Sequence, residues 1–402
     1  MPKSFRVAGL LSFTSIRKGN PGIILLTISI LTLVSLNLLF IPGLLQGLVS
    51  GANRQLRNTY SSDIVVQSNT INPFLDNASA LVSEIHAIDG VAAVTSRNNL
   101  GAYFVFGNER TDAMVYGIQP ETDAEVFTIN KTIIEGTSLS PDDMDEIMLG
   151  VQLAGADKPN LELYARSLLH VHAGDEVNLI YGNGVQKQYR VKGIFYTQFL
   201  QTDAEAFVTQ AEMQSVYPES SGNAESIYVK AINDAAIPGI MTKINNIESG
   251  LRVSNWQDYA GIVQSLTDSF NVINVILNVV NLLIAGITVF IVTYIDVANR
   301  RRQIGVQRAI GITPWSIILS YLIRAMFYAV TAIVLAIVLF IFVVSPLEVM
   351  YPFYFPFGAV YLVIGLSNII RMIAIVLSVS LAASFLPVRG VMRMKIMDAI
   401  WG

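Results

Sequence analysis

The sequence of 402 residues contains no cysteine and only three histidines. Without cysteine there are no disulfides and no thiolate-bound metal, so a domain on the oxidising side of a membrane must be stabilised by its packed core. No Gly-x-x-x-x-Gly-Lys-Ser/Thr loop is present, so the chain cannot hold nucleotide phosphates by that route. Charged residues are scarce at 14% and hydrophobic ones reach 52%, which is too apolar for a soluble enzyme and too polar for an all-membrane bundle.

Four long apolar runs account for this composition. A bilayer core of ~30 Å requires roughly 20 apolar residues in a helix, and the runs that meet this length are 22–41, 272–295, 317–344 and 357–386. About 210 more polar residues separate the first run from the other three. The sequence therefore predicts an α-helical membrane protein with four transmembrane helices, one plus three, and a large extracytoplasmic α+β domain inserted between helices 1 and 2.

The distribution of charge predicts the orientation. Residues 51–261, called the outer domain below, hold 26 Asp and Glu against 13 Lys and Arg, whereas the rest of the chain holds 4 against 13. Cytoplasmic flanks of membrane helices are enriched in Lys and Arg, and both ends of this chain carry them: Lys3, Arg6, Arg17, Lys18, Arg389, Arg393 and Lys395. We expect a multi-pass protein of the plasma (inner) membrane with both termini cytoplasmic and the first span retained as a signal anchor.

The predicted organisation follows from these boundaries. It comprises a cytoplasmic amphipathic segment (1–20), transmembrane helix 1 (21–50) with a kink or break at Pro42, the outer domain (51–261), transmembrane helix 2 with a stalk (262–298), a cytoplasmic coupling helix (299–312), helix 3 (313–345), an outer loop (346–356), helix 4 (357–386) and a cytoplasmic tail (387–402).

The outer domain mixes two hydrophobic periods. Alternation of apolar and polar residues predicts strands at 63–67, 101–106, 114–118, 176–180, 188–195 and 226–231, and helical spacing predicts helices at 78–88, 210–217 and 235–248. Pro- and Gly-bearing joints near 136–141 and 218–222 suggest the edges of an inserted subdomain.

The second span carries a seam of polar and small residues spaced alternately by three and four. This seam consists of Gln264, Thr267, Asn271, Asn274, Asn278, Asn281, Ala285 and Thr288. Asparagine amides facing lipid would lack partners, so the seam must face protein or water. Two interpretations remain open: the ladder joins this helix to a second copy or to the first span, or it lines a polar groove between subunits that a substrate enters.

The turn between the second and third spans is strongly basic, running from Asn299 to Trp315 with four arginines. Thr313 followed by Pro314 is a good N-cap and first-turn pair for the next helix. A short helix at the inner membrane surface is predicted, and composition alone would make it an anchor for lipid head groups.

This turn resembles the pattern Arg-x-x-Glu-Ile-Gly-x-x-Arg-Ala-x-Gly of the MacB/FtsX-like permeases of ABC transporters. Further short resemblances occur in order at 146–154, 171–177, 189–195, 206–208 and, at the end, from Pro387 to Ile400. The resemblance implies a homodimer or heterodimer of permeases, bound to ABC ATPase subunits that carry the ATP and Mg. The ATPase-coupling residues that it indicates are Arg300, Arg301, Arg302, Gln303, Ile304, Gly305, Arg308, Ala309 and Gly311.

The sequence departs from the family pattern at Gln303, where a carboxylate is usual, and at Arg324, where the third helix usually carries Glu. Arg371 lies near the middle of the fourth span. An unpaired charge inside a bilayer is costly, so we expect both arginines to face protein or water and to contact carbonyls or the Asn seam. The alternative is that they extend toward the head groups.

Other chemistry has little support. His170 and His172 have no third clustered ligand, His86 stands alone, no nucleophile elbow is present, and the acidic outer domain does not suit nucleic acid. We therefore expect no catalytic site, no metal and no cofactor on this chain. By resemblance, it moves its outer domain to export or extract a lipid, lipoprotein or peptide. The alternative is a non-transporting regulator of a cell-wall hydrolase or a peptide sensor, while a secondary transporter would need paired broken helices.

Overall fold

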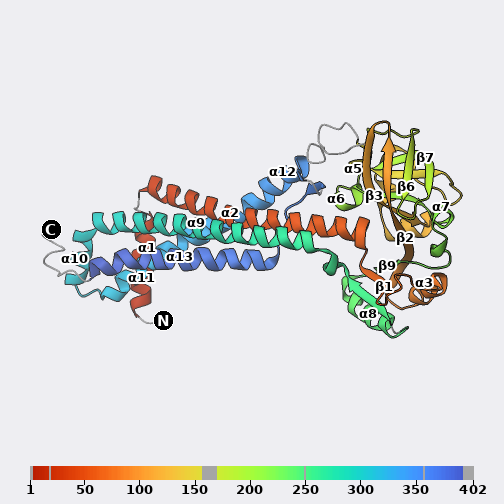
Figure 1. The fold of residues 1–402 in the computed structure, drawn as a ribbon. Coiled ribbons are helices and arrows are strands. Elements are labelled where there is room, and N and C mark those ends of the chain that lie inside the picture. Colours follow the sequence, from red (N-terminus) through yellow and green to blue (C-terminus); the bar gives the residue numbers. More distant parts are fainter. Residues whose placement is uncertain (1–2, 18–19, 156–169, 249, 356–357, 393–402) are drawn as a thin grey trace. The chain divides into compact units, whose positions relative to one another are not determined.

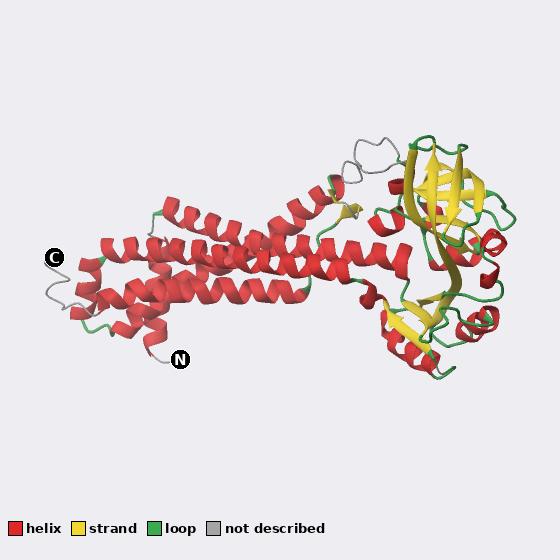
Figure 2. Cartoon of the chain, in the orientation of Figure 1, coloured by secondary structure: helices red, strands yellow, loops and turns green. Residues whose placement is uncertain are grey.

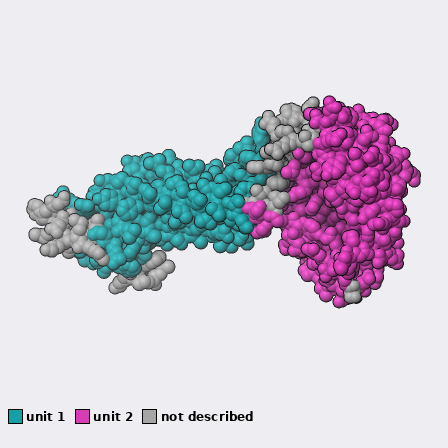
Figure 3. Space-filling model, in the orientation of Figure 1, with its two compact units in different colours: residues 1–49, 266–353, 359–402 teal, residues 50–265, 354–358 magenta. Residues whose placement is uncertain are grey.

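The computed structural model describes residues 3–17, 20–155, 170–248, 250–355 and 358–392. The chain forms two compact units (Figure 3). The membrane unit consists of Met1–Val49, Leu266–Phe353 and Ala359–Gly402, and the second unit, Ser50–Ser265 with Tyr354–Gly358, corresponds to the predicted outer domain and keeps that name. Each unit is described by itself.

Helices make up nearly all of the described membrane unit (Figure 1). Four of them are long and apolar enough to span a bilayer, which confirms the predicted one-plus-three layout. The elements are α1 (Lys3–Arg17), α2 (Pro21–Gln55), α9 (Gly261–Asn299), α10 (Arg301–Ala309), α11 (Pro314–Leu339), a π-helical turn (Phe340–Val344) leading into α12 (Ser345–Met350), the short strands β11 (Phe353–Phe355) and β12 (Gly358–Val360), and α13 (Leu366–Met392).

Small residues allow the spans to pack closely. One face of α11 carries Ala325, Ala329, Ala332 and Ala336, each at most 3% exposed, and this face lies in a core that α2, α9 and α13 complete. Alanines spaced by three and four residues let helix backbones approach one another. Dispersion between the close-packed helices then stabilises the bundle, because the hydrophobic effect does not drive helices together in lipid.

The first span is not broken at Pro42, as the sequence had suggested, because α2 runs through it. Beside it, Gly43 and Gly47 leave room for an extended segment. The Val363 N–H donates to the Gly43 carbonyl at 3.0 Å, and a Cβ on Gly47 would lie 2.1 Å from the Tyr361 carbonyl oxygen.

This extended segment corrects two further boundaries. Helix 4 begins at Leu366 and not at residue 357, since the chain before it pairs as β12 and then follows the glycines of α2. The predicted loop 346–356 begins instead as helix α12, whose Glu348 side chain accepts a hydrogen bond from the N–H of Leu362 in the returning chain. At the far end, α13 continues through Pro387 to Met392, whereas the tail residues 393–402 lie outside the described residues.

The outer domain is an α+β fold (Figure 2). Four of the six predicted strands match observed strands to within two residues at both ends, and the other two lie inside the longer strands 91–106 and 109–118. The three predicted helices are also present. Its principal elements are β1 (Ile64–Ser68), α3 (Ala78–His86), β2 (Val91–Phe106), β3 (Glu109–Ile118), α4 (Pro120–Val126), β4 (Ile133–Gly136), β5 (Glu146–Gly150), α5 (Val151–Ala154), β6 (Glu176–Tyr181), β7 (Gln186–Phe195), α6 (Leu200–Asp203), β8 (Ala206–Thr209), α7 (Gln210–Val216), β9 (Ser226–Ala231), α8 (Ile237–Asn245) and β10 (Leu251–Asn255).

Two lobes share the long strand β2. Its first half pairs with β9 in the order β10-β1-β9-β2, and α3 and α8 contribute to the core of that lobe. Its second half pairs with both β3 and β6, and because β6 also pairs with β7, the series β2-β3-β8-β5-β7-β6 closes on itself. Because the series closes, none of these six described strands is the terminal strand of an open sheet.

The inserted lobe therefore begins inside β2, after Arg97, and not near 136–141 as the glycines and proline had suggested. Gly136 ends β4 within the closed lobe, where Thr137 N–H donates to the Lys192 carbonyl. The other suggested edge, near 218–222, lies close to the place where the chain leaves the inserted lobe before β9. There the Asn98 side chain donates to the Asn223 carbonyl and accepts from the Glu225 N–H.

A buried ionic cluster lies where the two halves of β2 meet. Arg97 is 2% exposed, donates from Nε and Nη2 to the two carboxylate oxygens of Asp123 at 2.7 and 3.0 Å, and stacks on the Phe127 ring. Burial raises the pKa of the nearby Glu205 carboxyl to about 8, although Arg97 opposes the shift, and burial raises the pKa of Asp203 to about 7. Both carboxyls thus hold their protons more tightly in the folded protein than in the unfolded chain.

These raised pKa values predict that the outer domain becomes less stable as pH rises. Below the unfolded pKa the two states bind the proton alike, whereas between pH 5 and 8 unfolding releases protons and is favoured. We expect the thermal midpoint of the detergent-solubilised chain to fall over this range, and the fall to be smaller by on the order of 5 °C in Glu205→Gln. The exposed Glu219→Gln serves as the control, and equal pH profiles for all three proteins would contradict the prediction.

Candidate functional site

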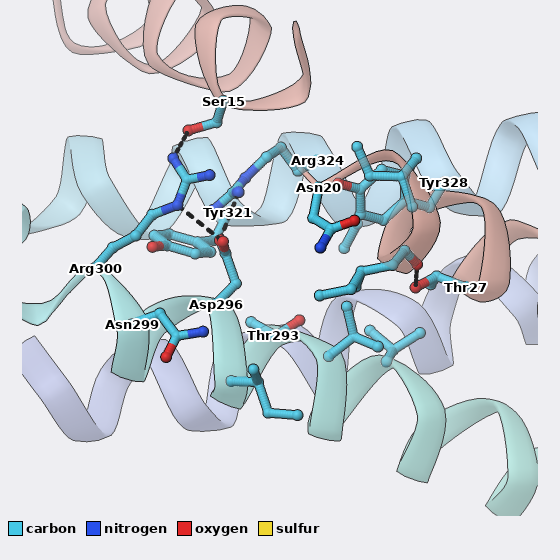
Figure 4. A pocket seen from close by; sticks show the side chains of 16 residues that line it. Ser15, Asn20, Thr27, Thr293, Asp296, Asn299, Arg300, Tyr321, Arg324 and Tyr328 are labelled. Carbon is cyan, nitrogen blue, oxygen red and sulfur yellow. Dashed lines mark hydrogen bonds and ion pairs between the residues drawn. The ribbon is translucent and has the colours of Figure 1, made fainter. Parts of the chain in front are cut away.

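One carboxylate joins three helices at the end of the membrane unit where α9 meets α10 (Figure 4). Asp296 of α9 accepts from Arg300 Nε at 2.9 Å through Oδ1 and from Arg324 Nη1 at 2.6 Å through Oδ2. Arg300, at the N-cap of α10, also donates from Nη1 to Ser15 Oγ of α1 at 3.0 Å. Charge-assisted bonds of this kind are about twice as strong as neutral ones.

Arg324 is the buried member of this cluster. Arg324 is 6% exposed, and its guanidinium carbon lies 4.0 Å from the centroid of the Tyr321 ring. The sequence correctly required protein contacts for Arg324 but predicted the wrong partner, because the structure supplies a carboxylate from the neighbouring helix and not a carbonyl or the Asn seam. The overlooked signal was Asp296 itself, a lone acid at the end of an apolar span.

A cavity of ≈ 250 Å³ lies beside Asp296 and between the helices (Figure 4). The side chains of Ser15, Asn20 and Asn299 give it a polar wall near the helix ends. Its remaining lining comes from α2, α9, the N-cap of α10 and α11, and includes Ile23, Ile24, Thr27, Val289, Val292, Thr293, Ile295, Asp296, Arg300, Tyr321, Arg324, Ala325 and Tyr328.

Helix α10 has an inner and an outer face. Ile304 and Gly305 are buried, and Ile304 joins a core with Val297, Ile317, Ile318, Tyr321 and Val388. The resemblance groups Ile304, Gly305 and Arg300 with the residues that contact an ATPase. In the structure Ile304 packs in the core of its own bundle, Gly305 is buried, and Arg300 pairs with Asp296. Between Arg301 and Gly311 the exposed residues are Arg302, Gln303, Val306, Ala309, Ile310 and Gly311.

A left-handed glycine and the predicted helix cap connect α10 to α11. Gly311 has φ +95°, a left-handed conformation that ends a helix without steric cost to glycine. Thr313 Oγ1 accepts from the Ser316 N–H at 3.4 Å and Pro314 opens α11, which confirms the predicted cap. Arg301 and Arg308 lie on the same short helix and are partly buried.

The Asn seam divides between two kinds of contact. Asn281 is 8% exposed and donates to Asn37 Oδ1 of α2 at 2.8 Å, so this rung joins the first span of the same chain. Asn278 donates to Asn274 within α9 at 3.0 Å, and Asn271 is exposed. Arg371 is exposed and lines a small cavity together with Asn278.

The histidines singled out in the sequence that the structure describes belong to the outer domain. His172 Nδ1 is 3.3 Å from Glu135 Oε2 on the outer domain, and His86 ends α3. Among the residues that the structure describes, no three His, Cys, Asp or Glu side chains are grouped to hold a metal ion.

The ion pair predicts non-additive effects on stability. Asp296→Leu leaves the buried Arg324 without its carboxylate partner and near Arg300, so it should lower stability strongly, whereas adding Arg324→Leu should recover part of that loss. We expect a coupling energy of about 1–3 kcal/mol from thermal or denaturant unfolding in detergent. Arg371→Leu, at an exposed position, is the control with a small effect, and simple additivity of the Asp296 and Arg324 costs would refute the coupling.

Part of the chain is similar to known proteins. Residues 275–396 match the model for the FtsX-like permease C-terminal domain. An uncharacterized ABC transporter permease of Methanocaldococcus jannaschii is 29% identical over 153 residues, which cover 35% of this chain and 40% of that relative. The match therefore spans less than half the length of the curated relative.

Two solved structures resemble the chain weakly. The extracellular domain of the noncanonic ABC-type transporter YknZ from Gram-positive bacteria has a TM-score of 0.34 at 12% identity and covers 48% of this chain and 99% of that one. The periplasmic region of MacB from Actinobacillus actinomycetemcomitans has a TM-score of 0.36 at 13% identity and covers 52% and 95%.

The basic turn from Arg300 to Gly311, from which the resemblance was first drawn, falls inside the matched residues 275–396. The FtsX-like part of the resemblance drawn from the sequence is thereby confirmed. Residues 275–396, which hold most of α9 and the helices α10 to α13, are similar to the FtsX-like permease C-terminal domain.

Proposed function

We propose that this chain is the permease subunit of an ABC transporter and that a separate ATPase subunit, which binds ATP and Mg, docks on α10. The exposed face of α10 is the observation that carries the proposal. It presents the apolar side chains of Val306 and Ile310, 48% and 73% exposed, beside Arg302 and Gln303. An apolar centre with a polar, basic rim is the usual composition of a protein interface.

The inner face of α10 supports a mechanical role. Ile304 packs with Val297 of α9, Ile317 of α11 and Val388 of α13. Asp296 and Arg300 add an ion pair between α9 and the start of α10. A displacement of α10 by a closing ATPase is therefore expected to move these helices together, because packed cores transmit strain.

Helix α9 is the element suited to carry that movement outward. Its 39 residues extend ~58 Å at ~1.5 Å per residue, which is longer than a bilayer core. Its face away from the bundle is apolar and exposed, with Val275, Ile276 and Leu283 each more than half exposed, and this face is available to lipid or to a second permease copy. Movement of the outer domain would then export or extract a lipid, lipoprotein or peptide.

The docking proposal predicts that a charge on the exposed face of α10 removes the ATPase. Ile310→Glu and Val306→Glu should each lower co-purification of the ATPase about tenfold or more, because a buried unpaired carboxylate opposes association. Ile232→Glu, at a position 66% exposed on the outer domain, is the matched control and should retain the ATPase. Gly305→Glu cannot distinguish loss of ATPase docking from damage to the permease, since Gly305 is buried within the permease.

Full retention of the ATPase by Ile310→Glu, with the variant folded as judged by its thermal transition, would exclude this docking face.

The proposed orientation can be tested by single-cysteine labelling, because the natural chain contains no cysteine. A membrane-impermeant maleimide should label Ile232→Cys in intact cells. It should label Ile310→Cys only after the membrane is permeabilised. Equal labelling of both variants in intact cells would place the two sites on one side and contradict the topology.

A further inference from the structure

The cavity beside Asp296 has an uneven charge. Among its lining residues Arg300 and Arg324 are basic and Asp296 is the one acid. Because a single carboxylate faces two guanidinium groups, the site retains one excess positive charge. The N-terminus of α2 adds a partial positive charge, since Asn20 lines the cavity and this 35-residue helix begins at Pro21.

One donor in this cavity lacks a partner. Arg324 Nε is buried and has no hydrogen-bond acceptor within the described chain, although Nη1 is bound to Asp296. The residue is 6% exposed, so bulk water does not readily satisfy it. An unsatisfied buried donor of a charged group costs free energy that an anionic acceptor in the cavity would recover.

The lining is amphiphilic. Ser15, Asn20, Asn299 and Arg300 lie where α1 ends, α2 begins and α9 ends, whereas the wall deeper in the bundle comes from residues such as Val289 and Ala325. A volume of ≈ 250 Å³ accommodates a small anionic head but not a whole lipid.

The outside of the bundle next to the cavity is apolar. On α2, Leu25 and Leu26 are 67% and 57% exposed, and on α9, Ile291 and Ile295 are 48% and 44% exposed. Acyl chains can therefore remain in the bilayer against these helices while the head occupies the cavity.

From these observations we propose that the cavity binds the phosphodiester head group of an anionic phospholipid, with Arg324 and Arg300 as its cationic partners. Basic pockets between membrane helices bind lipid head groups by this chemistry. In the orientation proposed above the lipid belongs to the inner leaflet, but the binding site itself does not depend on the proposed transport function. Occupancy would hold together α1, α2, α9 and α11 next to the α10 turn.

The test is lipid binding to the purified full-length chain by native mass spectrometry. The probes are phosphatidylglycerol and phosphatidylcholine with identical acyl chains, each titrated onto wild type and variants. We expect wild type to bind one phosphatidylglycerol about tenfold more tightly than phosphatidylcholine, and Arg324→Gln to lose that preference. Asp296→Asn should strengthen phosphatidylglycerol binding, because it removes the competing negative charge even though it weakens the ion pair.

The control is Arg389→Gln, which removes a positive charge from an exposed position near the end of α13 outside this cavity. It should keep the preference within about twofold. If the thermal transition shows that Arg324→Gln is not folded, Asp296→Asn still tests the proposal, because it is expected to increase phosphatidylglycerol binding.

Three results would overturn the proposal. An unchanged lipid preference in both Arg324→Gln and Asp296→Asn would show that the cavity is not the site. An equal loss in Arg389→Gln would indicate diffuse surface charge, and complete displacement of phosphatidylglycerol by excess inorganic phosphate would assign the cavity to a free anion.

Discussion

The membrane unit depends on the need to pair charge in a medium that does not solvate it. Asp296 meets that need for two arginines at once, and by doing so it joins α9 to α11 and to the start of α10. Arg300 extends the same connection to α1 through Ser15. Removing the carboxylate would leave the buried Arg324 guanidinium unpaired, so the cost of breaking this junction is high and its geometry is well defined.

The same constraint explains the less regular parts of the bundle. An extended segment is tolerated beside α2 because Gly43 and Gly47 let its backbone approach, and because the Val363 N–H finds the Gly43 carbonyl. Asn281 and Asn37 satisfy one another across α9 and α2. Without these hydrogen bonds, each of the polar groups would lack a partner inside the hydrocarbon of the bilayer.

The outer domain solves a comparable problem without lipid. Its two lobes share β2, and the strand changes partners next to the buried Arg97–Asp123 pair. A fully buried ion pair adds little net stability compared with apolar residues, but leaving either partner alone is costly. Burial raises the pKa of the nearby Glu205 and Asp203 carboxyls, so both groups hold their protons more tightly than in the unfolded chain.

The sequence by itself determined the elements whose signals are local or strongly periodic. Length and hydropathy predicted four spans, alternation predicted strands such as β9, and Thr313 with Pro314 predicted the start of α11. These properties depend on neighbours within one turn or one strand, so they can be read before the chain is folded.

Only the tertiary structure decided which distant residues meet. The partner of Arg324 lies 28 residues away on another helix, and no periodicity links the two. Packing also placed Ile304 and Arg300 of the basic turn on the inside and left Val306 and Ile310 exposed. It set the start of helix 4 at Leu366, because the preceding segment packs against Gly47. Such contacts are chosen by the whole fold, because burial and charge pairing depend on surfaces that exist only once the helices have assembled.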